Sequence, residues 1–200
     1  MSTVLYVATA EGVVTVKNAG AEWAIGSHGI KQWDVNEIAV EPSAPNRVYA
    51  ATRGDGVLRS EDYGETWSKP NRGKPGPGKV KCVTIDPHDP KTVYAGGEPI
   101  VLWVTHDRGE NWESLDGIAD VPGIGEIDYP VPAVEPHIRD VVVDATDPNT
   151  LYATLQVGHM IKTTDGGKTW KLLNNAVDAD AHKLVSRKDR PEQLYLSTGG

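Results

Sequence analysis

The chain alternates short apolar runs with turns rich in glycine and proline along its whole length. Runs such as 35–40 (VNEIAV), 80–85 (VKCVTI) and 138–143 (IRDVVV) are rich in the β-branched residues that favour strands. Each run is too short for a helix and is followed by a turn that contains proline. Because no segment of helical length shows an amphipathic period, the pattern predicts an all-β protein.

A repeat underlies this alternation. An aliphatic residue followed by tyrosine recurs with spacings of 43, 45, 58 and 43 residues, at Tyr6, Tyr49, Tyr94, Tyr152 and Tyr195. Each unit holds a strand, a proline turn, a second strand that ends in a glycine-rich hairpin, and two further strands. Four antiparallel strands in about 43 residues match the size of one propeller blade.

An eight-residue turn separates the third and fourth strands of three units. Its copies are SEDYGETW at 60–67, THDRGENW at 105–112 and TTDGGKTW at 163–170. They share four positions, occupied by Ser60, Asp62, Gly64 and Trp67, by Thr105, Asp107, Gly109 and Trp112, and by Thr163, Asp165, Gly167 and Trp170. A worn copy, VKNAGAEW, keeps Val16, Asn18, Gly20 and Trp23 at these positions.

We expect this turn to be structural. An aspartate at this spacing accepts hydrogen bonds from the backbone of its own turn, and the glycine two residues later supplies the positive φ. The serine or threonine hydroxyl adds a further bond, and the tryptophan suits packing between neighbouring sheets. A role as calcium ligands or catalytic acids is disfavoured, because each aspartate lies in its own unit without a second carboxylate at ligand spacing.

The motif Ser/Thr-x-Asp-x-Gly-x-x-Trp resembles the Asp-box (BNR) repeat of sialidases, xyloglucanases, sortilin-type receptors and photosystem II assembly-factor propellers. The segments TIDPHDPKTVYAGG and VVDATDPNTLYAT are similar to that superfamily too, so the resemblance covers nearly the whole chain. It implies a β-propeller of four-stranded antiparallel blades, and these residues would form the front part of a ring of about six to eight blades. It leaves the function open, since these relatives include hydrolases, receptors and assembly factors.

The repeat predicts one propeller over residues 1–200. Its blades would span about 4–47, 48–92, 93–150 and 151–193, with the start of a fifth at 194–200. The third unit is longer than the others, and its surplus forms a loop at 114–136. Because long loops inside compact domains are usually functional or disordered, we expect this loop to cover the channel mouth through Glu126, Asp128, Tyr129 and Glu135.

Composition and charge restrict the partners and the location. A net charge of -8 and a pI near 5.2 argue against a binder of nucleic-acid backbones. The opening residues do not read as a signal peptide, and no segment reaches the length of a membrane span, so we expect a cytoplasmic protein without membrane contact. The single cysteine, Cys82, precludes an internal disulfide, and we expect no cofactor.

Polar residues mark the start of every inner strand. They lie fifteen and thirteen residues before each signature tyrosine, at Asp34, Asn36, Lys79, Lys81, His137, Arg139, Asp180 and His182. Alternate residues of a strand share one face, so we expect these side chains to point into the channel and hold a polar or anionic ligand. The alternative is a water-filled, charge-balanced channel. The predicted ligand-binding set is His137, Arg139, His182, Asp180, Lys79, Lys81, Asp34, Arg53 and Tyr129.

The predicted function is a scaffold that binds a glycan or protein ligand on the channel face, with Trp33 and Tyr129 as aromatic anchors. The alternative is a glycoside hydrolase of sialidase-like or xyloglucanase-like type with its site at the channel mouth. Hydrolysis needs two carboxylates across the sugar, or an arginine cluster and a tyrosine nucleophile in a sialidase. No acid and base pair is identifiable, and the Arg-Ile-Pro signature that the resemblance leads us to expect of a sialidase is missing.

A metal site is a third alternative. His137, His159 and His182 would have to converge with Asp180 or Glu98. Their spacing carries no metal-binding motif, so we rank this below the other two.

Overall fold

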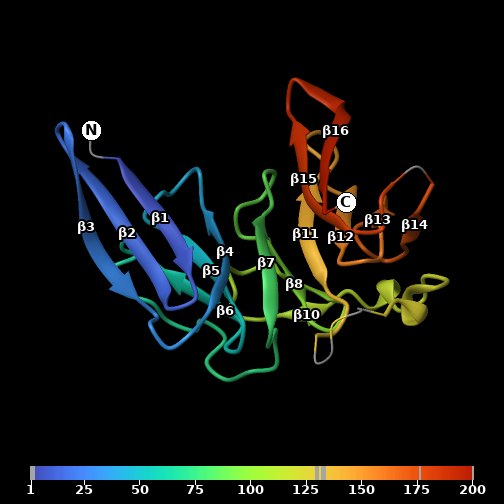
Figure 1. Ribbon diagram of the computed structural model, residues 1–200, viewed down its shortest axis with the longest axis horizontal. Helices are drawn as coiled ribbons and strands as arrows, with labels where there is room; N and C mark the ends of the chain where they lie inside the picture. The colour runs from blue at the N-terminus through green and yellow to red at the C-terminus, as the bar shows by residue number, and fades with distance from the viewer. Residues whose placement is uncertain (1–2, 129–130, 132–133, 176, 200) are drawn as a thin grey trace.

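The computed structural model describes residues 3–128, 131, 134–175 and 177–199, which form five antiparallel sheets and contain no α-helix (Figure 1). The first sheet consists of β1 (Val4–Thr9), β2 (Gly12–Ala19) and β3 (Glu22–Gly29). The second consists of β4 (Val35–Val40), β5 (Val48–Thr52) and β6 (Val57–Ser60), and a single bridge from Arg59 to Ser68 stands in place of a fourth strand.

The third and fourth sheets have the predicted four strands. The third holds β7 (Val80–Ile85), β8 (Val93–Gly97), β9 (Val101–Thr105) and β10 (Glu113–Ser114). The fourth holds β11 (Ile138–Val143), β12 (Leu151–Leu155), β13 (Met160–Thr163) and β14 (Lys171–Leu173). The fifth is the hairpin of β15 (Ala181–Arg187) and β16 (Arg190–Thr198). The all-β propeller prediction is therefore confirmed.

The sheets stand one after another in an arc, with the first and the fifth at its two ends (Figure 1). The inner strands β4, β7, β11 and β15 lie side by side along the channel. In the second to fifth sheets the signature tyrosine lies in the second strand. The repeat units in the sequence were counted from that tyrosine, so each sheet begins one strand earlier than its repeat unit. The expected blades at about 4–47, 48–92, 93–150 and 151–193 are offset from the sheets by that one strand.

The 114–136 loop contributes the only helical segments that the structure describes. These are the short 3-10 turns η1 (Asp116–Ile118) and η2 (Ile124–Glu126). Neither is long or apolar enough to cross a membrane. The cytoplasmic location and the ring of about six to eight blades stay predictions.

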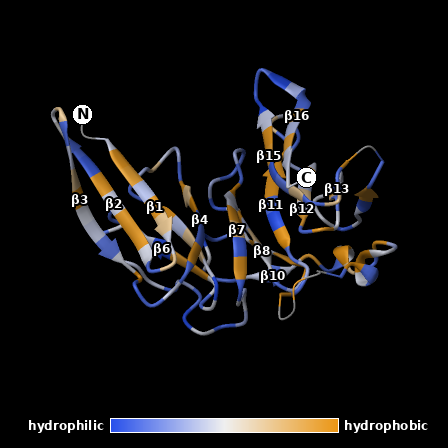
Figure 2. Cartoon of the chain, in the orientation of Figure 1, coloured by the Kyte–Doolittle hydropathy of each residue, from blue (hydrophilic) through white to orange (hydrophobic). Residues whose placement is uncertain are grey.

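The core lies between facing sheets. Along β5, Tyr49 and Ala51 face the third sheet while Ala50 packs against the first, so the whole strand is buried. The second strands β8 and β12 are buried along their whole length as well. Figure 2 shows the resulting pattern of apolar strands and polar connecting turns. Close approach requires Gly96, because a Cβ there would meet Ile138 Cγ2 at 2.6 Å.

The Asp-box turns have the predicted hydrogen bonds. Asp62 Oδ1 accepts a hydrogen bond from the Thr66 N–H at 2.8 Å, and Asp165 Oδ1 accepts one from the Thr169 N–H at 2.9 Å. The glycines at the predicted position have φ of 81°, 94° and 90°, at Gly64, Gly109 and Gly167. The residue before each glycine is left-handed too, which the motif did not indicate, at Tyr63, Arg108 and Gly166.

The tryptophans of the three complete turns fasten each sheet to the one before it. Trp67 joins the apolar cluster around Val13 of the first sheet, and Trp170 joins the cluster that contains residues of the third. Trp170 is 6% exposed, and its Nε1 donates a hydrogen bond to the Gly167 carbonyl at 3.0 Å. The worn copy forms the β2–β3 hairpin instead, where Trp23 pairs with Asn18 and is 49% exposed.

We predict that Trp170→Ala lowers the free energy of unfolding by about 3–5 kcal/mol, because it removes a large buried side chain from a sheet junction. Trp23→Ala is the matched control from the worn copy and should cost less than about 1 kcal/mol. Urea unfolding of both variants measures the difference. Equal losses would show that the complete turns do not fasten the sheets.

A second prediction concerns acid. Hydrogen bonds from the Thr66 and Thr169 hydroxyls hold the pKa of Asp62 and Asp165 below the ordinary range. A carboxyl whose pKa is lowered by folding stabilises the fold above its unfolded pKa, and this contribution is lost as the pH falls. We expect the free energy of unfolding to fall below about pH 4, and to fall less steeply in Asp165→Asn. Parallel pH profiles in urea would contradict this.

Candidate functional site

A β-bulge lies near the start of each inner strand. The pairing register shifts between Val35 and Glu37, between Val80 and Cys82, and between Ile138 and Asp140. The same shift occurs in β15, between residues 181 and 184. The residues left out of the ladder are Asn36, Lys81, Arg139, His182 and Lys183. Because a bulge re-aims the side chain that it releases, these polar groups turn into the channel.

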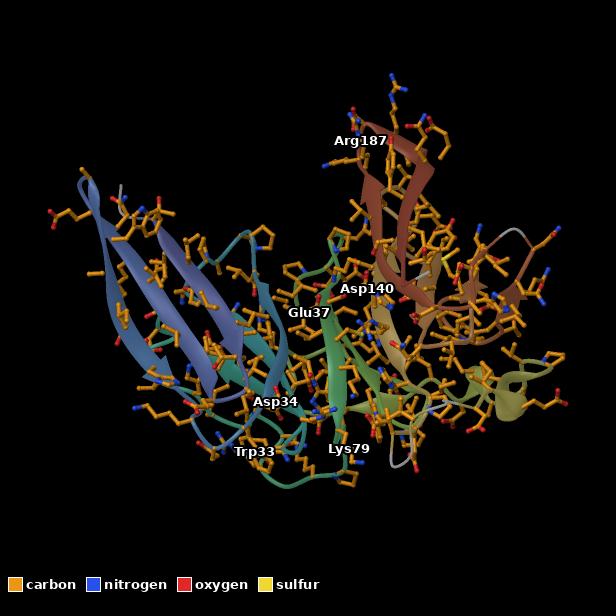
Figure 3. All side chains as sticks on the ribbon, in the orientation of Figure 1. Trp33, Asp34, Glu37, Lys79, Asp140 and Arg187 are labelled. Carbon is orange, nitrogen blue, oxygen red and sulfur yellow. The ribbon has the colours of Figure 1, made fainter. Side chains whose placement is uncertain are left out.

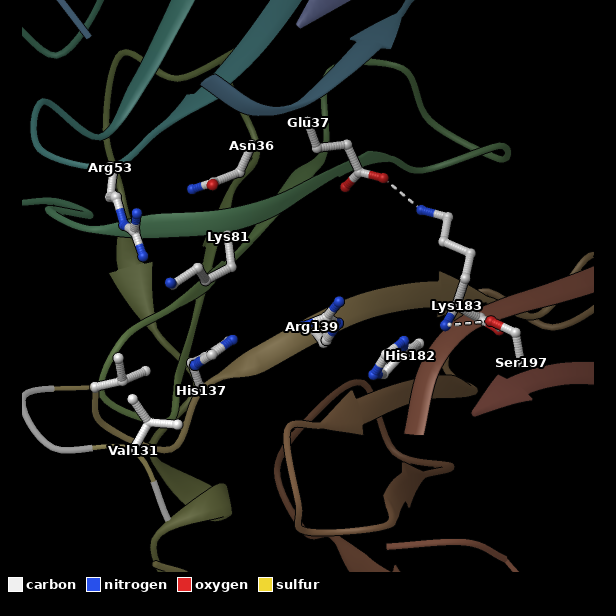
Figure 4. A pocket seen from close by; sticks show the side chains of 11 residues that line it. Asn36, Glu37, Arg53, Lys81, Val131, His137, Arg139, His182, Lys183 and Ser197 are labelled. Carbon is white, nitrogen blue, oxygen red and sulfur yellow. Dashed lines mark hydrogen bonds and ion pairs between the residues drawn. The ribbon is translucent and has the colours of Figure 1, made fainter. Parts of the chain in front are cut away.

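These side chains surround a cavity of about 610 Å³ at the start of the inner strands, which we call the mouth cavity (Figure 4). Its lining consists of Asn36, Glu37, Arg53, Lys81, Val131, Val134, His137, Arg139, His182, Lys183 and Ser197. A volume of this order suits a small ligand or one group of a larger ligand. The structure thus brings Arg53, Lys81, His137, Arg139 and His182 of the predicted set together, from four sheets.

Three predicted residues, each fifteen residues before its signature tyrosine, do not line the mouth cavity, whereas His137 at the equivalent position does. Asp34 and Lys79 form ion pairs instead, and Asp180 forms a hydrogen bond with His182. Asp34 Oδ2 lies 3.2 Å from Arg53 Nη1, and Lys79 Nζ lies 3.3 Å from Glu98 Oε1. Asp180 Oδ1 lies 3.1 Å from His182 Nε2. Figure 3 shows Asp34 and Lys79 near the start of the inner strands.

The loop and the aromatic anchors also differ from expectation. The 114–136 loop reaches the mouth cavity through Val131 and Val134 rather than through its carboxylates. Trp33 covers the neighbouring hairpin, where a Cβ on Gly54 would meet its ring at 2.1 Å. Tyr129 lies outside the described residues.

The lining is cationic. Arg53, Lys81, Arg139 and Lys183 line the cavity, whereas Glu37 is the only carboxylate among its described lining residues. Three of these cations have carboxylate partners. Lys81 pairs with Glu98 at 2.7 Å, Arg53 with Asp34, and Lys183 with both Glu37 and Asp140.

Arg139 is held differently. Its Nη1 donates a hydrogen bond to Oε1 of the neutral side chain of Gln156. The amide of Gln156 in turn donates to Asp180 Oδ1 at 2.8 Å, which fixes its orientation. Among the described residues no carboxylate lies within ion-pair distance of Arg139, and its side chain is exposed in the cavity. Arg139 is therefore positioned without being neutralised.

The two histidines of the lining are also fixed. His137 is 5% exposed, and its Nδ1 lies 2.9 Å from the Glu135 carbonyl, to which it can donate. Burial lowers the pKa of His137, so its imidazole is neutral near pH 7. In the part of the chain that the structure describes, no three His, Cys, Asp or Glu side chains are arranged to hold a metal ion. His159 instead bonds to the Val177 carbonyl.

Sequence reasoning missed Glu37 and Lys183, which lie twelve residues before their signature tyrosines. The same position holds Asp140 in the fourth sheet and Cys82 in the third. A charged residue in a largely apolar strand was the available signal at Glu37, whereas β15 also holds Arg187 and other polar residues, so Lys183 did not stand out. Counting only the fifteenth and thirteenth positions overlooked it.

We predict unequal effects for the two lysines that contact Glu98. The side chains of Lys81 and Glu98 are 10% and 5% exposed, whereas that of Lys79 is 54% exposed. Burial on its own raises the pKa of Glu98, but Lys81 and, to a smaller extent, Lys79 together outweigh it, so the pKa lies below its ordinary value. Lys81→Met should lower the free energy of unfolding by about 3 kcal/mol, because it leaves the buried carboxylate of Glu98 with only the exposed Lys79 as a partner.

Lys79→Met is the control and should cost less than about 1 kcal/mol, as is usual for an exposed pair. Urea unfolding at neutral pH gives both values. A loss in Lys79→Met as large as that in Lys81→Met would refute the assignment of Lys81 as the main partner of Glu98.

Comparison with known proteins supports the fold. A family model described as "Sortilin, neurotensin receptor 3" (Sortilin-Vps10) matches residues 55–196. The xyloglucanase Xgh74A of Acetivibrio thermocellus is 30% identical over 167 residues, which cover 70% of this chain and 20% of that protein. The vacuolar protein sorting/targeting protein 10 of Uncinocarpus reesii is 38% identical over 69 residues, or 33% of this chain and 4% of that protein.

A solved structure gives the same result. The GH74 enzyme of Niastella koreensis superposes with a TM-score of 0.68 at 17% identity, over 98% of this chain and 31% of that one. This likeness shows the propeller fold alone. The chain spans a fifth or less of the length of these curated relatives.

Proposed function

Because this chain belongs to the Sortilin-Vps10 family of β-propellers, we propose that it is a binding module whose mouth cavity receives an acidic group of a glycan or protein ligand. The observation that carries the proposal is Arg139. It is exposed in the cavity, is oriented by a neutral amide and has cationic neighbours on the strands on both sides. A guanidinium held in this way is free to form paired hydrogen bonds with a carboxylate or sulfate.

The charge of the cavity differs from that of the whole chain. The chain carries a net charge of -8, whereas the lining has four cationic side chains and one carboxylate. Three of these cations are already paired with carboxylates, so Arg139 is the cation that an acidic group in the cavity can pair with.

The ligand should also offer an apolar part. Val131 and Val134 line the cavity beside His137, so one side of it is not polar. A uronic acid ring or an acidic peptide residue with an aliphatic stem combines the two properties. Both fall within the glycan and protein classes of ligand.

Hydrolysis of a glycan is the second candidate, and the similarity to a xyloglucanase favours it. Burial raises the pKa of Glu37, which suits a general acid. A glycosidase of the usual kind needs a second carboxylate across the sugar, however, and among the described residues Glu37 has no such partner in the lining. The geometry therefore favours binding over catalysis.

We predict that D-glucuronate binds and that D-glucose binds at least about tenfold more weakly, because only the former can pair with Arg139. Arg139→Ala should weaken glucuronate binding by about tenfold or more. Arg187→Ala, at the far tip of the β15–β16 hairpin (Figure 3), is the matched control and should bind normally. Amide NMR titrations at constant ionic strength measure all four cases.

Equal affinity for the acid and the neutral sugar would contradict the proposal. A xyloglucan oligosaccharide provides the test of the second candidate. Release of new reducing ends by the wild type but not by Glu37→Gln would replace binding with hydrolysis as the function.

A further inference from the structure

The channel contains a second cavity on the other side of Glu37 and Lys183. It has a volume of about 350 Å³ and extends along the inner strands past Asp140 to the proline turns at their far ends, where Pro42 and Pro87 line it. We call it the far cavity. Two residues, Glu37 and Lys183, line both cavities. These two side chains therefore form the boundary between them.

Glu37 and Lys183 meet across the channel. They are 146 residues apart in sequence, on β4 and β15, and the Lys183 ammonium donates a hydrogen bond to Glu37 Oε1 (Figure 4). The strands β7 and β11 lie between β4 and β15 in the order of the sheets. The ion pair thus spans the space that the four inner strands enclose.

Each partner is also anchored to a neighbouring strand. Glu37 Oε2 accepts a hydrogen bond from the Val83 N–H at 2.9 Å. Asp140, which is 2% exposed, accepts one from Lys183 Nζ at 2.9 Å and one from the Leu184 N–H at 2.8 Å. Because the two oxygens of Glu37 have different partners, its bond to Lys183 can break while its bond to Val83 remains.

Lys183 is accessible from the mouth cavity. Its side chain is 54% exposed, against 24% for Glu37 and 2% for Asp140. One ammonium serves two carboxylates here, so the three groups together carry one negative charge. An anion that enters the mouth cavity between Arg139 and Lys183 competes with Glu37 for the ammonium.

We propose that the ion pair between Glu37 and Lys183 is the floor of the mouth cavity and that an acidic ligand opens it. The anionic group of the ligand takes the Lys183 ammonium from Glu37, and Glu37 takes up a proton from solvent. Asp140 keeps its contact with Lys183. The inference rests on the proposed binding of an acidic ligand and makes Lys183 a second residue that selects it.

Proton uptake follows from the surroundings of Glu37. A half-buried carboxylate that loses its cation and gains an anionic neighbour is destabilised in its charged form. Burial already raises the pKa of Glu37 while Lys183 is in place, so it rises further when Lys183 is diverted. Since the complex holds more protons than the free protein, affinity increases as the pH falls.

Other groups around Glu37 must be separated from this effect. Asp140 faces it from β11, Lys183 from β15, and Lys81 and the buried thiol of Cys82 lie on β7. Arg53 lines the same cavity from the hairpin after β5, and so do two histidines, His137 and His182. Protonation of the histidines also favours an anion. The variant Glu37→Gln isolates the contribution of Glu37, because it keeps the histidines and removes the carboxylate.

The test uses inorganic sulfate as the probe, since it stays a dianion across the pH range. Its affinity is measured by amide NMR at about pH 7.5 and about pH 5.5, with chloride holding the ionic strength constant. We expect the wild type to bind about tenfold more tightly at the lower pH. Glu37→Gln should bind at least about fivefold more tightly than the wild type at the higher pH, with a smaller pH dependence.

Lys183→Met should weaken binding at both pH values, and it is scored only if its melting temperature stays close to that of the wild type. Suppose that the wild type binds sulfate, that Arg139→Ala does not, and that Glu37→Gln binds with the affinity of the wild type at both pH values. This result would overturn the inference about the floor and leave the proposed function intact. If neither the wild type nor Glu37→Gln binds sulfate, the proposed function and this inference are both overturned. Binding by Glu37→Gln alone would support a closed floor.

Discussion

Face-to-face packing of sheets is the constraint on which this structure depends. A sheet between two others must bury both faces of its second strand, and β5, β8 and β12 are buried along their whole length. Small residues at the same repeat position, Ala50, Ala95 and Ala153, let neighbouring sheets approach, and none of them is exposed to solvent. Buried strands of this kind cannot carry unpaired charge. Accordingly, β5, β8 and β12 contain no charged residue.

The inner strands raise a separate problem, because those of different sheets are not paired by backbone ladders among the described residues. Side chains join them instead. Glu37 of β4 accepts the Val83 N–H of β7, and Asp140 of β11 accepts the Leu184 N–H of β15. Glu37 and Asp140 occupy equivalent positions two sheets apart. Each carboxylate accepts a hydrogen bond from the backbone of the inner strand of the next sheet. Between β7 and β11 the equivalent residue is Cys82, and Thr84 bonds to the Val141 carbonyl there.

Much of this arrangement could be predicted from the sequence, and the rest depends on backbone register. The spacing of the signature tyrosines and the Asp-box residues predicted the strands, the turns and the end of the channel at which polar residues gather. The worn copy kept Trp23 but has Asn18 where the complete turns have aspartate, and it forms a hairpin. A bulge cannot be inferred from a period of two, which is why Glu37 and Lys183 were missed.

Carboxylates around the channel also determine which cations have an ion-pair partner. Glu37 and Asp140 hold Lys183 because their structural bonds place them beside it, and Glu98 holds Lys81. At Arg139 the neighbouring hairpin supplies Gln156, an amide, where the third sheet has Glu98. The hairpin residue four positions after the signature tyrosine is therefore a carboxylate beside Lys81 and a neutral amide beside Arg139. Where Glu98 gives Lys81 an opposite charge, the amide of Gln156 orients Arg139 through a hydrogen bond and supplies no charge.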